Sequence, residues 1–526
     1  MTGSLVLQFG PTRLRLTPRV RLASLYLRTE VRNIELIGRD KLTYAGYVDG
    51  AFVKGEGQTF TVENPSDESV VEELTGASTA QFNTAIEAAR TAFDDGRWSG
   101  LSMQQRGETM RRYAEALRKR ADRLKELAIL EAGCPVNSTV MGAQVHAPLR
   151  MTDDIVDMFL TLPEHEENPL PIRERVNPYF TVQSLKLYRP LGVVSAISAY
   201  NVPFYTAFWK VVPALMAGDS VILRPNPLTP ISSLIFAEAA EEAGIPKGVF
   251  NVLIESGLEG GQLMSTHKGV DLVSFTGSCT VGAKVAEQAA PTLKRLVLEL
   301  GGKSAAIFLP DSVGRAAAHA HQVCTAHAGQ GCVLGTRVFV PQENKAEVLE
   351  AMAAAVANVK IGVASDPETV LGPVISANQR ARCEHFTAAA VEAGGRVVAG
   401  GKRPAGLDKG YFFEPTVLDV PDNSNPAAQE EIFGPVVTVI GYKDLDHAVE
   451  MANDSQFGLS AWVTGQDKVK ALDVGLKIRS GAVNVNGAVM SSYASGGGIK
   501  MSGLGRERGK EGLREFQMVT TFNLGG

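Results

Sequence analysis

The segment AHAHQVCTAHAGQGCVLGTR, at positions 318–337, places three histidines and two cysteines within fourteen residues. Such a set could bind a metal, form a redox pair, or contain a nucleophilic thiol with unrelated neighbours. Zinc-binding helices use two histidines at i and i+4, and H-x-H-x2-C-x2-H lacks that pair, so no metal site is predicted. Cys324 and Cys332, on a helix and a following loop, stand too far apart to pair without distortion.

Cys332 is the candidate nucleophile of this segment. Gly329, Gly331 and Gly335 flank it and allow a ligand to approach the backbone closely. A thiol attacks as its thiolate, so this role needs access and a lowered pKa. A single cysteine is more often inert and buried, and the residues alone leave both interpretations open.

Two further motifs could support chemistry. Glu299, in LELGGKS at 298–304, ends an apolar strand, where burial would raise its pKa and suit it to act as a base near neutral pH. An ion pair with a nearby cation is the alternative for this carboxylate. The turn SFTGSCTVG at 274–282 joins a strand to a helix and directs N–H groups at an anion, such as a nucleotide pyrophosphate. Its spacing, Gly277-x4-Gly282, is not the G-x-G-x-x-G fingerprint, and a steric need for glycine would also explain it.

The elements that must position these residues follow an α/β pattern. Short apolar strands alternate with helices, which predicts parallel sheets covered on both faces. A second α/β set begins with strands at 305–309 and 337–341. Early helices are predicted at 81–94 and at 105–132, the latter capped by Gly133. The strands expected in the first sheet are 191–199, 219–225, 248–254, 270–277 and 296–302, with a helix at 231–244.

Two segments, 179–190 and 516–526, alternate polar and apolar residues with a period of two. They predict exposed β-strands outside the parallel sheets, which favour pairing with another subunit. A β-arm packed on its own chain is the alternative.

The composition is that of an ordinary globular protein. The 526 residues carry a net charge of −5 and are 44% hydrophobic, enough for two or more domains. This charge favours neither a nucleic-acid partner nor an anionic membrane, and no run approaches the ~18 apolar residues that span a bilayer. Five cysteines in so long a chain favour a reducing cytoplasm over a disulfide framework.

The first 41 residues differ from the rest, because five arginines precede the first acidic residue, Glu30. We expect a disordered extension, or a start codon assigned too far upstream. An organelle transit peptide is the alternative.

Six motifs occur in this order: AYNVPF at 199–204, FTGSCTVG at 275–282, LELGGKS at 298–304, GQGC at 329–332, EEIFGPV at 430–436 and GGIKMSGLGRERG at 497–509. Together they resemble the aldehyde dehydrogenase superfamily, from about residue 44 to the end of the chain. The resemblance implies an α/β fold of two doubly wound parallel-sheet domains plus a small β oligomerisation element. It places the cofactor-binding domain at 42–171 and 191–300, the catalytic domain at 301–506, and bridging strands at 172–190 and 507–526.

The resemblance also implies catalytic roles. Cys332 matches the nucleophile that attacks the aldehyde carbonyl. Asn201 matches the side chain that donates to the resulting oxyanion, with the N–H of Cys332 as second donor, and such donors are worth ~3–4 kcal/mol each. Glu299 matches the base that activates water to hydrolyse the thioester. Lys210 and Glu507 match positions that help to pass its proton on.

The cofactor implied is NAD, with NADP as an alternative. Glu431 and Phe433 match the residues that hold the nicotinamide ribose and ring, and Gly277, Ser278 and Gly257 match the pyrophosphate and adenosine wall. The full set of expected contacts is Ser198, Tyr200, Arg224, Gly257, Gly277, Ser278, Gly282, Leu300, Glu431 and Phe433.

Two departures from the family concern the cofactor. Arg224 and Pro227 stand where a lysine and a glutamate usually bind the adenosine ribose. Loss of the carboxylate removes repulsion of a 2′-phosphate, and Arg224 could pair with one. Tyr200 replaces a usual tryptophan beside the cofactor.

A third departure concerns the substrate tunnel. Gly496 replaces a phenylalanine that lines it, Val202 and Thr206 occupy two other tunnel positions, and Trp209 remains as an aromatic wall. A bulky aromatic, terpenoid or long-chain aldehyde is therefore expected, because it fills a wide tunnel that acetaldehyde cannot. The loop 489–494 could fill that space instead.

The sequence thus predicts an NAD(P)-dependent aldehyde dehydrogenase that forms a carboxylate, as a cytoplasmic homodimer or homotetramer without a nucleic-acid or membrane partner. A CoA-acylating relative is the alternative, which Glu299 disfavours because such enzymes often lack this base. Intact Cys332, Asn201 and Glu299 disfavour a non-catalytic protein on the same fold. A metal-dependent protein using the histidines is the last alternative.

Overall fold

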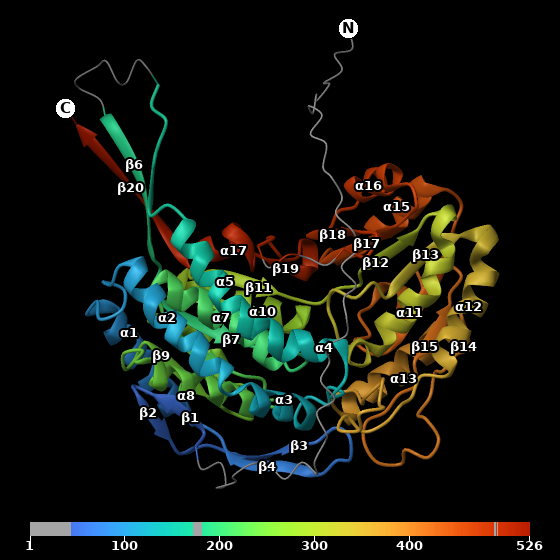
Figure 1. The fold of residues 1–526 in the computed structure, drawn as a ribbon, viewed down its shortest axis with the longest axis horizontal. Helices are drawn as coiled ribbons and strands as arrows, with labels where there is room; N and C mark the ends of the chain where they lie inside the picture. Colours follow the sequence, from blue (N-terminus) through green and yellow to red (C-terminus); the bar gives the residue numbers. More distant parts are fainter. Residues whose placement is uncertain (1–43, 172–180, 489–490, 492, 526) are drawn as a thin grey trace, which may run out of the picture. The chain divides into compact units, whose positions relative to one another are not determined.

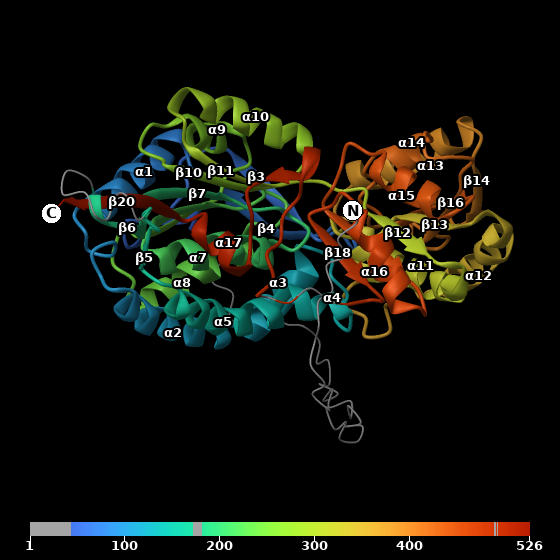
Figure 2. The same ribbon diagram turned by 90° about the horizontal axis from the view of Figure 1, so that it is seen from above.

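The computed structural model describes residues 44–171, 181–488, 491 and 493–525. Two large sheets, each with helices packed on it, make up most of this part of the chain (Figures 1 and 2), and a three-stranded and a two-stranded sheet complete it. The extension expected at 1–41, and the first residues of the strand expected at 179–190, lie outside the described residues.

The five strands expected in the first sheet form its parallel core. In spatial order they run β11-β10-β7-β8-β9, and each neighbouring pair is parallel. All residues of β7, β8 and β9 are buried, which explains why the sequence shows them as continuous apolar runs. The bounds are β7 Val193–Ile197, β8 Ser220–Arg224, β9 Phe250–Leu253, β10 Leu272–Thr276 and β11 Arg295–Glu299.

The predicted parallel pairing of strands is confirmed for the core of this sheet but is wrong for its edges. β1 (Gly46–Val48) pairs antiparallel with β9 and turns back into β2 (Ala51–Val53). Asp49 and Gly50, at φ 49° and 84°, form the two-residue turn of that hairpin. At the other edge β19 (Gly503–Leu504) pairs antiparallel with β11. Such strands need no crossover helix, so alternation of strands and helices could not predict them.

Helices cover both faces of the first sheet (Figure 2). α1 begins at a capping box formed by Ser78 and Gln81, which confirms the helix expected near 81–94. One face carries α1 (Thr79–Asp94), α9 (Glu259–Thr266) and α10 (Cys279–Ala289), and the other carries α2 (Met103–Arg118), α5 (Ala147–Thr161), α7 (Pro203–Ala217) and α8 (Leu234–Ala243).

The helix expected at 105–132 is instead two helices, α2 and α3 (Ala121–Leu130), with a turn between them. Arg120, in that turn, forms ion pairs with Glu238 and Glu242 of α8 at 3.0 and 2.7 Å. This tertiary contact holds the turn against a neighbouring helix, and helical periodicity alone does not reveal it. Gly133 lies past the end of α3 and is not its cap.

The second sheet has the order β14-β15-β16-β13-β12-β17-β18, and only the edge strand β14 is antiparallel within it. Its strands are β12 (Ala305–Phe308), β13 (Arg337–Pro341), β14 (Arg396–Ala399), β15 (Thr416–Asp419), β16 (Val436–Tyr442), β17 (Ser460–Thr464) and β18 (Ala482–Val485). α11 (Ala316–Thr325) and α12 (Lys345–Ala357) pack on one face, and α13 (Ala377–Glu392), α15 (Leu445–Asn453) and α16 (Lys468–Leu476) on the other.

The two alternating segments form an antiparallel arm. β6 (Thr181–Pro190) and β20 (Gln517–Gly525) run side by side (Figure 1), and β5 (His165–Glu167) extends the sheet. Val519 and Phe522 remain 54% and 42% exposed in the single chain, so the arm presents apolar surface.

The remaining elements are short. β3 (Thr59–Glu63) and β4 (Val70–Thr75) pair antiparallel. The other helical segments are α4 (Thr139–Met141), η1 (Gly142–His146), η2 (Ile231–Ser233), η3 (Ala290–Thr292), η4 (Pro310–Arg315), η5 (Ala326–Gly329), η6 (Gln342–Asn344), α14 (Pro426–Gln429), η7 (Lys500–Ser502) and α17 (Gly509–Arg514).

Candidate functional site

A cavity of about 740 Å³ lies at the carboxyl ends of the first sheet's strands and is closed by loops of the second sheet. Asn201, Glu299 and Cys332 all line it, although they are far apart in the sequence. So do most of the expected cofactor contacts: Ser198, Tyr200, Arg224, Gly257, Gly277, Ser278, Leu300, Glu431 and Phe433. Gly282, Lys210 and Glu507 do not line this cavity.

Cys332 lies in the loop before β13 and is half-buried. Burial raises the pKa of its thiol to about 12; Glu431 and Glu299 raise it further, while Arg508 lowers it. The lowered pKa that a nucleophilic thiol needs is therefore not found, because burial raises the pKa of Cys332 and two carboxylates in the cavity add to this effect. Attack by this sulfur requires that its proton pass to a base.

A left-handed turn leads into this loop. His327, Ala328 and Gly329 have φ of 51°, 52° and 70°, and a run of this kind is strained for residues other than glycine. The turn brings the carbonyl of Gln330 to 2.8 Å from Asn201 Nδ2, while Gln144 Nε2 donates to the Asn201 carbonyl at 2.8 Å. Asn201, the expected oxyanion donor, is thus held on both sides by glutamines that the sequence did not single out.

The histidines of this segment are engaged in packing. His319 Nε2 lies 2.8 Å from the carbonyl of Gly335. Burial lowers the pKa of His327 to about 4, so its ring is neutral. Within the described ranges no cluster of three His, Cys, Asp or Glu side chains could hold a metal ion.

Glu299 ends β11 and faces the cavity. Burial raises the pKa of its carboxyl to about 8; Glu507 raises it, and Lys210, Arg508 and Arg506 lower it. Its Oε1 is buried and has no hydrogen-bond partner in the described part of the chain. A carboxylate of this kind can accept a proton near neutral pH, as the strand position predicted.

Lys210 and Glu507 form an ion pair beside this base. Lys210 Nζ lies 2.6 Å from Glu507 Oε1 and 3.2 Å from Ser274 Oγ, and the lysine side chain is fully buried. α7 carries Lys210 and starts with Pro203, which suits the first turn of a helix.

The part of the cavity where the cofactor is expected lies at the turn before α10. Ser278 caps this helix, its Oγ accepting from the N–H of Val281 at 3.3 Å. A Cβ at Gly277 would lie 2.5 Å from the Phe275 ring, so this wall admits only glycine. These groups suit an anion above a helix N-terminus, and the cavity volume suits a dinucleotide. Gly282 has a packing role instead, because a Cβ there would lie 2.5 Å from Leu300.

Glu431 and Phe433 close the opposite wall. Glu431 Oε1 accepts from the N–H of Gly302 at 2.9 Å, and burial raises the pKa of its carboxyl. Phe433 has φ 60° and meets Tyr200 edge to face, with ring centroids 5.9 Å apart. An aromatic pair and a carboxylate thus line the same cavity as the glycine turn.

Arg224 is already bound within the protein. Its Nε lies 2.9 Å from Glu255 Oε1, and its Nη2 donates to the Gly257 carbonyl at 2.6 Å. Glu255 also accepts from the N–H groups of Gly260 and Gly261 at the start of α9. The suggestion that Arg224 pairs with a 2′-phosphate is therefore not supported, because its charge is compensated by Glu255, a residue that the sequence did not single out.

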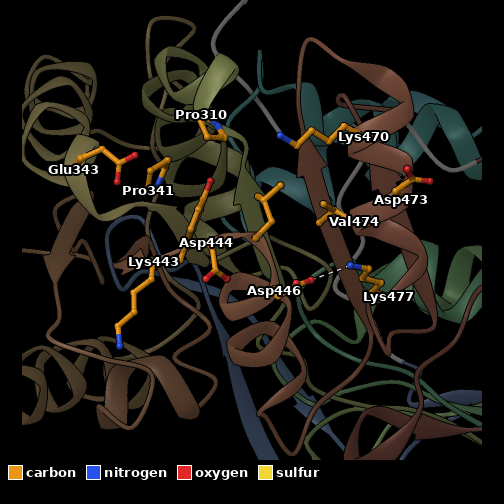
Figure 3. Close-up of a pocket in the computed structure, with 12 residues that line it drawn as sticks. Pro310, Pro341, Glu343, Lys443, Asp444, Asp446, Lys470, Asp473, Val474 and Lys477 are labelled. Atoms are coloured by element: carbon orange, nitrogen blue, oxygen red, sulfur yellow. Dashed lines mark hydrogen bonds and ion pairs between the residues drawn. The ribbon is translucent and has the colours of Figure 1, made fainter.

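A second cavity, of about 500 Å³, lies at the carboxyl ends of β13 and β16 (Figure 3). Pro341, Tyr442 and the start of α15 line it, and Lys477 forms an ion pair with Asp446 at 2.9 Å. Its walls carry lysines and acids but neither cysteine nor histidine, so we assign the chemistry to the larger cavity.

The comparisons with known proteins agree with this geometry. The model of the aldehyde dehydrogenase family matches residues 52–522. A Staphylococcus epidermidis protein named as an aldehyde dehydrogenase is 34% identical over 484 residues, covering 90% of this chain and 98% of its own.

Solved structures give the same result. A Pseudomonas syringae aldehyde dehydrogenase C mutant, in complex with NAD+ and octanal, has a TM-score of 0.86 at 34% identity, covering 91% of this chain and 96% of its own. Betaine aldehyde dehydrogenase of Staphylococcus aureus, in complex with NAD+, has a TM-score of 0.87 at 34% identity, covering 92% and 95%. A search of the described helices finds none that is long and apolar enough to cross a membrane.

Proposed function

Because the chain belongs to the aldehyde dehydrogenase family, we propose that it oxidises an aldehyde to a carboxylate with Cys332 as nucleophile and Glu299 as base. One observation carries this proposal: the Glu299 carboxyl, with its pKa raised to about 8, lines the same cavity as the Cys332 thiol and the Asn201 amide.

Each residue has a defined task. The Cys332 sulfur attacks the carbonyl carbon after its proton passes to a base, and the Asn201 amide with the Cys332 N–H stabilises the oxyanion. NAD+, when bound, accepts the hydride that leaves this carbon and so leaves a thioester on Cys332. Glu299 then takes a proton from water as the water oxygen attacks the thioester, which releases the carboxylate and restores the thiol.

Hydrolysis is favoured over transfer to CoA by the same base. Glu299 Oε1 is free to accept a proton, and the Lys210–Glu507 pair beside it can pass the proton on. A thiol acceptor would need no such base.

NAD is the cofactor that the residues fit. The glycine turn and the N-terminus of α10 would hold the pyrophosphate, and Glu431 and Phe433 would hold the nicotinamide ribose and ring. Arg224 is neutralised by Glu255, which disfavours the additional phosphate of NADP. Two similar solved structures hold NAD+.

A long or bulky aldehyde is the proposed substrate. Val202, just before α7, and Thr206, on α7, are half-buried, and the structure with octanal shows that a similar protein binds an eight-carbon aldehyde. We also propose a homodimer or homotetramer in the cytoplasm, since the β6–β20 arm presents apolar side chains and all five cysteines are free.

An aldehyde panel with NAD+ tests the proposal. Wild type should oxidise octanal and aromatic aldehydes with higher kcat/KM than acetaldehyde, and Cys332→Ala should oxidise none. Gly496→Phe should reverse that order by steric loss, and Val202→Phe, at the residue before α7, provides a second test should the first variant misfold. Equal kcat/KM for small and large aldehydes in wild type and both variants would contradict the substrate proposal, and turnover by Cys332→Ala would contradict the mechanism.

A further inference from the structure

Arg508 is a cation near the reacting groups that lacks a carboxylate partner. Its guanidinium lies over the rings of Tyr205 and Trp209, 5.3 and 5.4 Å from their centroids. In the part of the chain that the structure describes it forms no ion pair or hydrogen bond. By contrast, Lys210 and Arg224 at the same site are each paired with a glutamate.

The rings beneath Arg508 belong to α7, where the resemblance places part of the substrate tunnel. Tyr205 and Trp209 are one turn apart on α7, the helix that carries the expected tunnel position Thr206 and directly follows Val202. The charge of Arg508 lowers the pKa of both Cys332 and Glu299, so the guanidinium is within electrostatic reach of the reacting thiol and of the base.

The backbone of Arg508 is strained. Its φ of 64° and ψ of 168° fall in a region that only glycine occupies readily. Glycine would fit there without strain, and the chain nevertheless carries an arginine. Strain of this kind persists where a side chain has a task that the surrounding structure enforces.

We propose that Arg508 determines specificity by binding a carboxylate that the aldehyde carries on the part of the molecule leading away from the carbonyl. This rests on the proposed function and names its substrate class more narrowly. A guanidinium presents paired N–H donors that match a carboxylate, and the aromatic rings give the rest of the substrate an apolar wall. The indole Nε1 of Trp209, buried and without a partner among the described residues, adds an unused donor to this wall.

A neutral aldehyde of the same size is the disfavoured substrate. It would exclude water from the guanidinium without supplying the negative charge of a carboxylate, and removing a charge from water without a compensating partner is costly. The matched pair 4-carboxybenzaldehyde and 4-carbamoylbenzaldehyde isolates this effect, because the two differ in charge and hardly in shape.

The first experiment compares kcat/KM for this pair, with NAD+ as cofactor. Wild type should prefer the carboxylate at least about tenfold, the scale of one charge-assisted hydrogen bond. Arg508→Gln should reduce the ratio to near one, mainly through KM, and Arg508→Lys should restore part of it. Lys510→Gln, which removes a charge of the same sign from an exposed position on α17, should leave the ratio as in wild type.

Binding to Cys332→Ala separates this inference from the proposed function. In that background the carboxylate should bind at least about tenfold more tightly than the amide, and adding Arg508→Gln should remove the difference. A binding preference without turnover in wild type would contradict the proposed function alone. Turnover of both aldehydes with equal kcat/KM, or an equal loss for both in Arg508→Gln, would overturn the role of Arg508.

The melting temperature of a further variant distinguishes a role of Arg508 in substrate recognition from a purely structural role. Arg508→Gly relieves the backbone strain and should raise the melting temperature while abolishing the carboxylate preference. A lower melting temperature together with an unchanged ratio would show that Arg508 serves packing and would overturn the proposal.

Discussion

Lys210 Nζ lies 2.6 Å from Glu507 Oε1, and these two charges act on the base Glu299 in opposite directions. Glu507 raises the pKa of Glu299 and Lys210 lowers it, while burial makes the largest contribution and raises it. The pair therefore adjusts the pH at which the carboxyl of the proposed base is deprotonated, in addition to the larger effect of burial.

Replacement of Glu507 by glutamine should move the pH dependence of turnover. Removing this carboxylate lowers the pKa of Glu299, so the base is deprotonated at a lower pH and the rise of kcat with pH shifts downward. Lys210 loses its buried partner, so a lower melting temperature is also expected. The measurement is kcat between pH 6 and 9.5, with the exposed Glu511→Gln as control. An unmoved or upward-shifted profile would contradict this role.

Glu299→Gln should separate the two halves of the reaction. Acylation of Cys332 proceeds, whereas hydrolysis of the thioester lacks its base. Stopped-flow absorbance should show a burst of reduced cofactor close to one per active site, followed by turnover at least about a hundredfold slower, the low end for loss of a general base. Full steady-state turnover in this variant would remove Glu299 from the mechanism.

The sequence predicted what depends on continuous local patterns. The strands β7, β8 and β9 are buried throughout, so their apolar runs were visible, and residues that follow strand ends, such as Asn201, meet at one edge of a parallel sheet. Cys332 precedes β13 of the second sheet, so only the resemblance carried by the six motifs brought it together with Glu299, and both line one cavity.

Contacts between distant side chains could not be predicted in this way. The Arg224–Glu255 pair joins residues 31 positions apart, and it neutralises the positive charge that Arg224 would otherwise present to the cofactor. Ion pairing with α8 holds the turn at Arg120, and the spacing of apolar residues along the chain does not indicate this contact. The pKa of Cys332 is raised by burial and by the carboxylates of Glu431 and Glu299, and neither contribution can be read from the local sequence.

The Arg224–Glu255 pair predicts a change in cofactor preference. Glu255→Gln removes the charge that neutralises Arg224, so a 2′-phosphate is no longer repelled and gains a guanidinium partner. The ratio of kcat/KM for NADP to that for NAD should rise at least about tenfold, the scale of one charge-assisted hydrogen bond. Pro227→Glu, which adds a carboxylate to the same wall, should move the ratio in the other direction. If both variants keep the wild-type ratio of kcat/KM for the two cofactors, this wall of the cavity does not discriminate between them at the adenosine ribose.

Glu131 links stability to pH. Its carboxyl is fully buried and accepts from the N–H groups of Ile231 and Ser232 at 2.9 and 3.0 Å, and burial raises its pKa from 4.5 to about 7. The folded state therefore holds this proton between pH 4.5 and about 7 while the unfolded state releases it, so the contribution of Glu131 to stability falls as pH rises through that window. The fall amounts to about 3 kcal/mol. Urea denaturation gives the free energy of unfolding of wild type and of Glu131→Gln at each pH. From pH 4.5 to 8 the value for wild type should fall by about this amount relative to the value for the variant. The exposed Glu108→Gln serves as control, and a difference that stays constant over this range would show that Glu131 is ionised in the folded protein at pH 4.5.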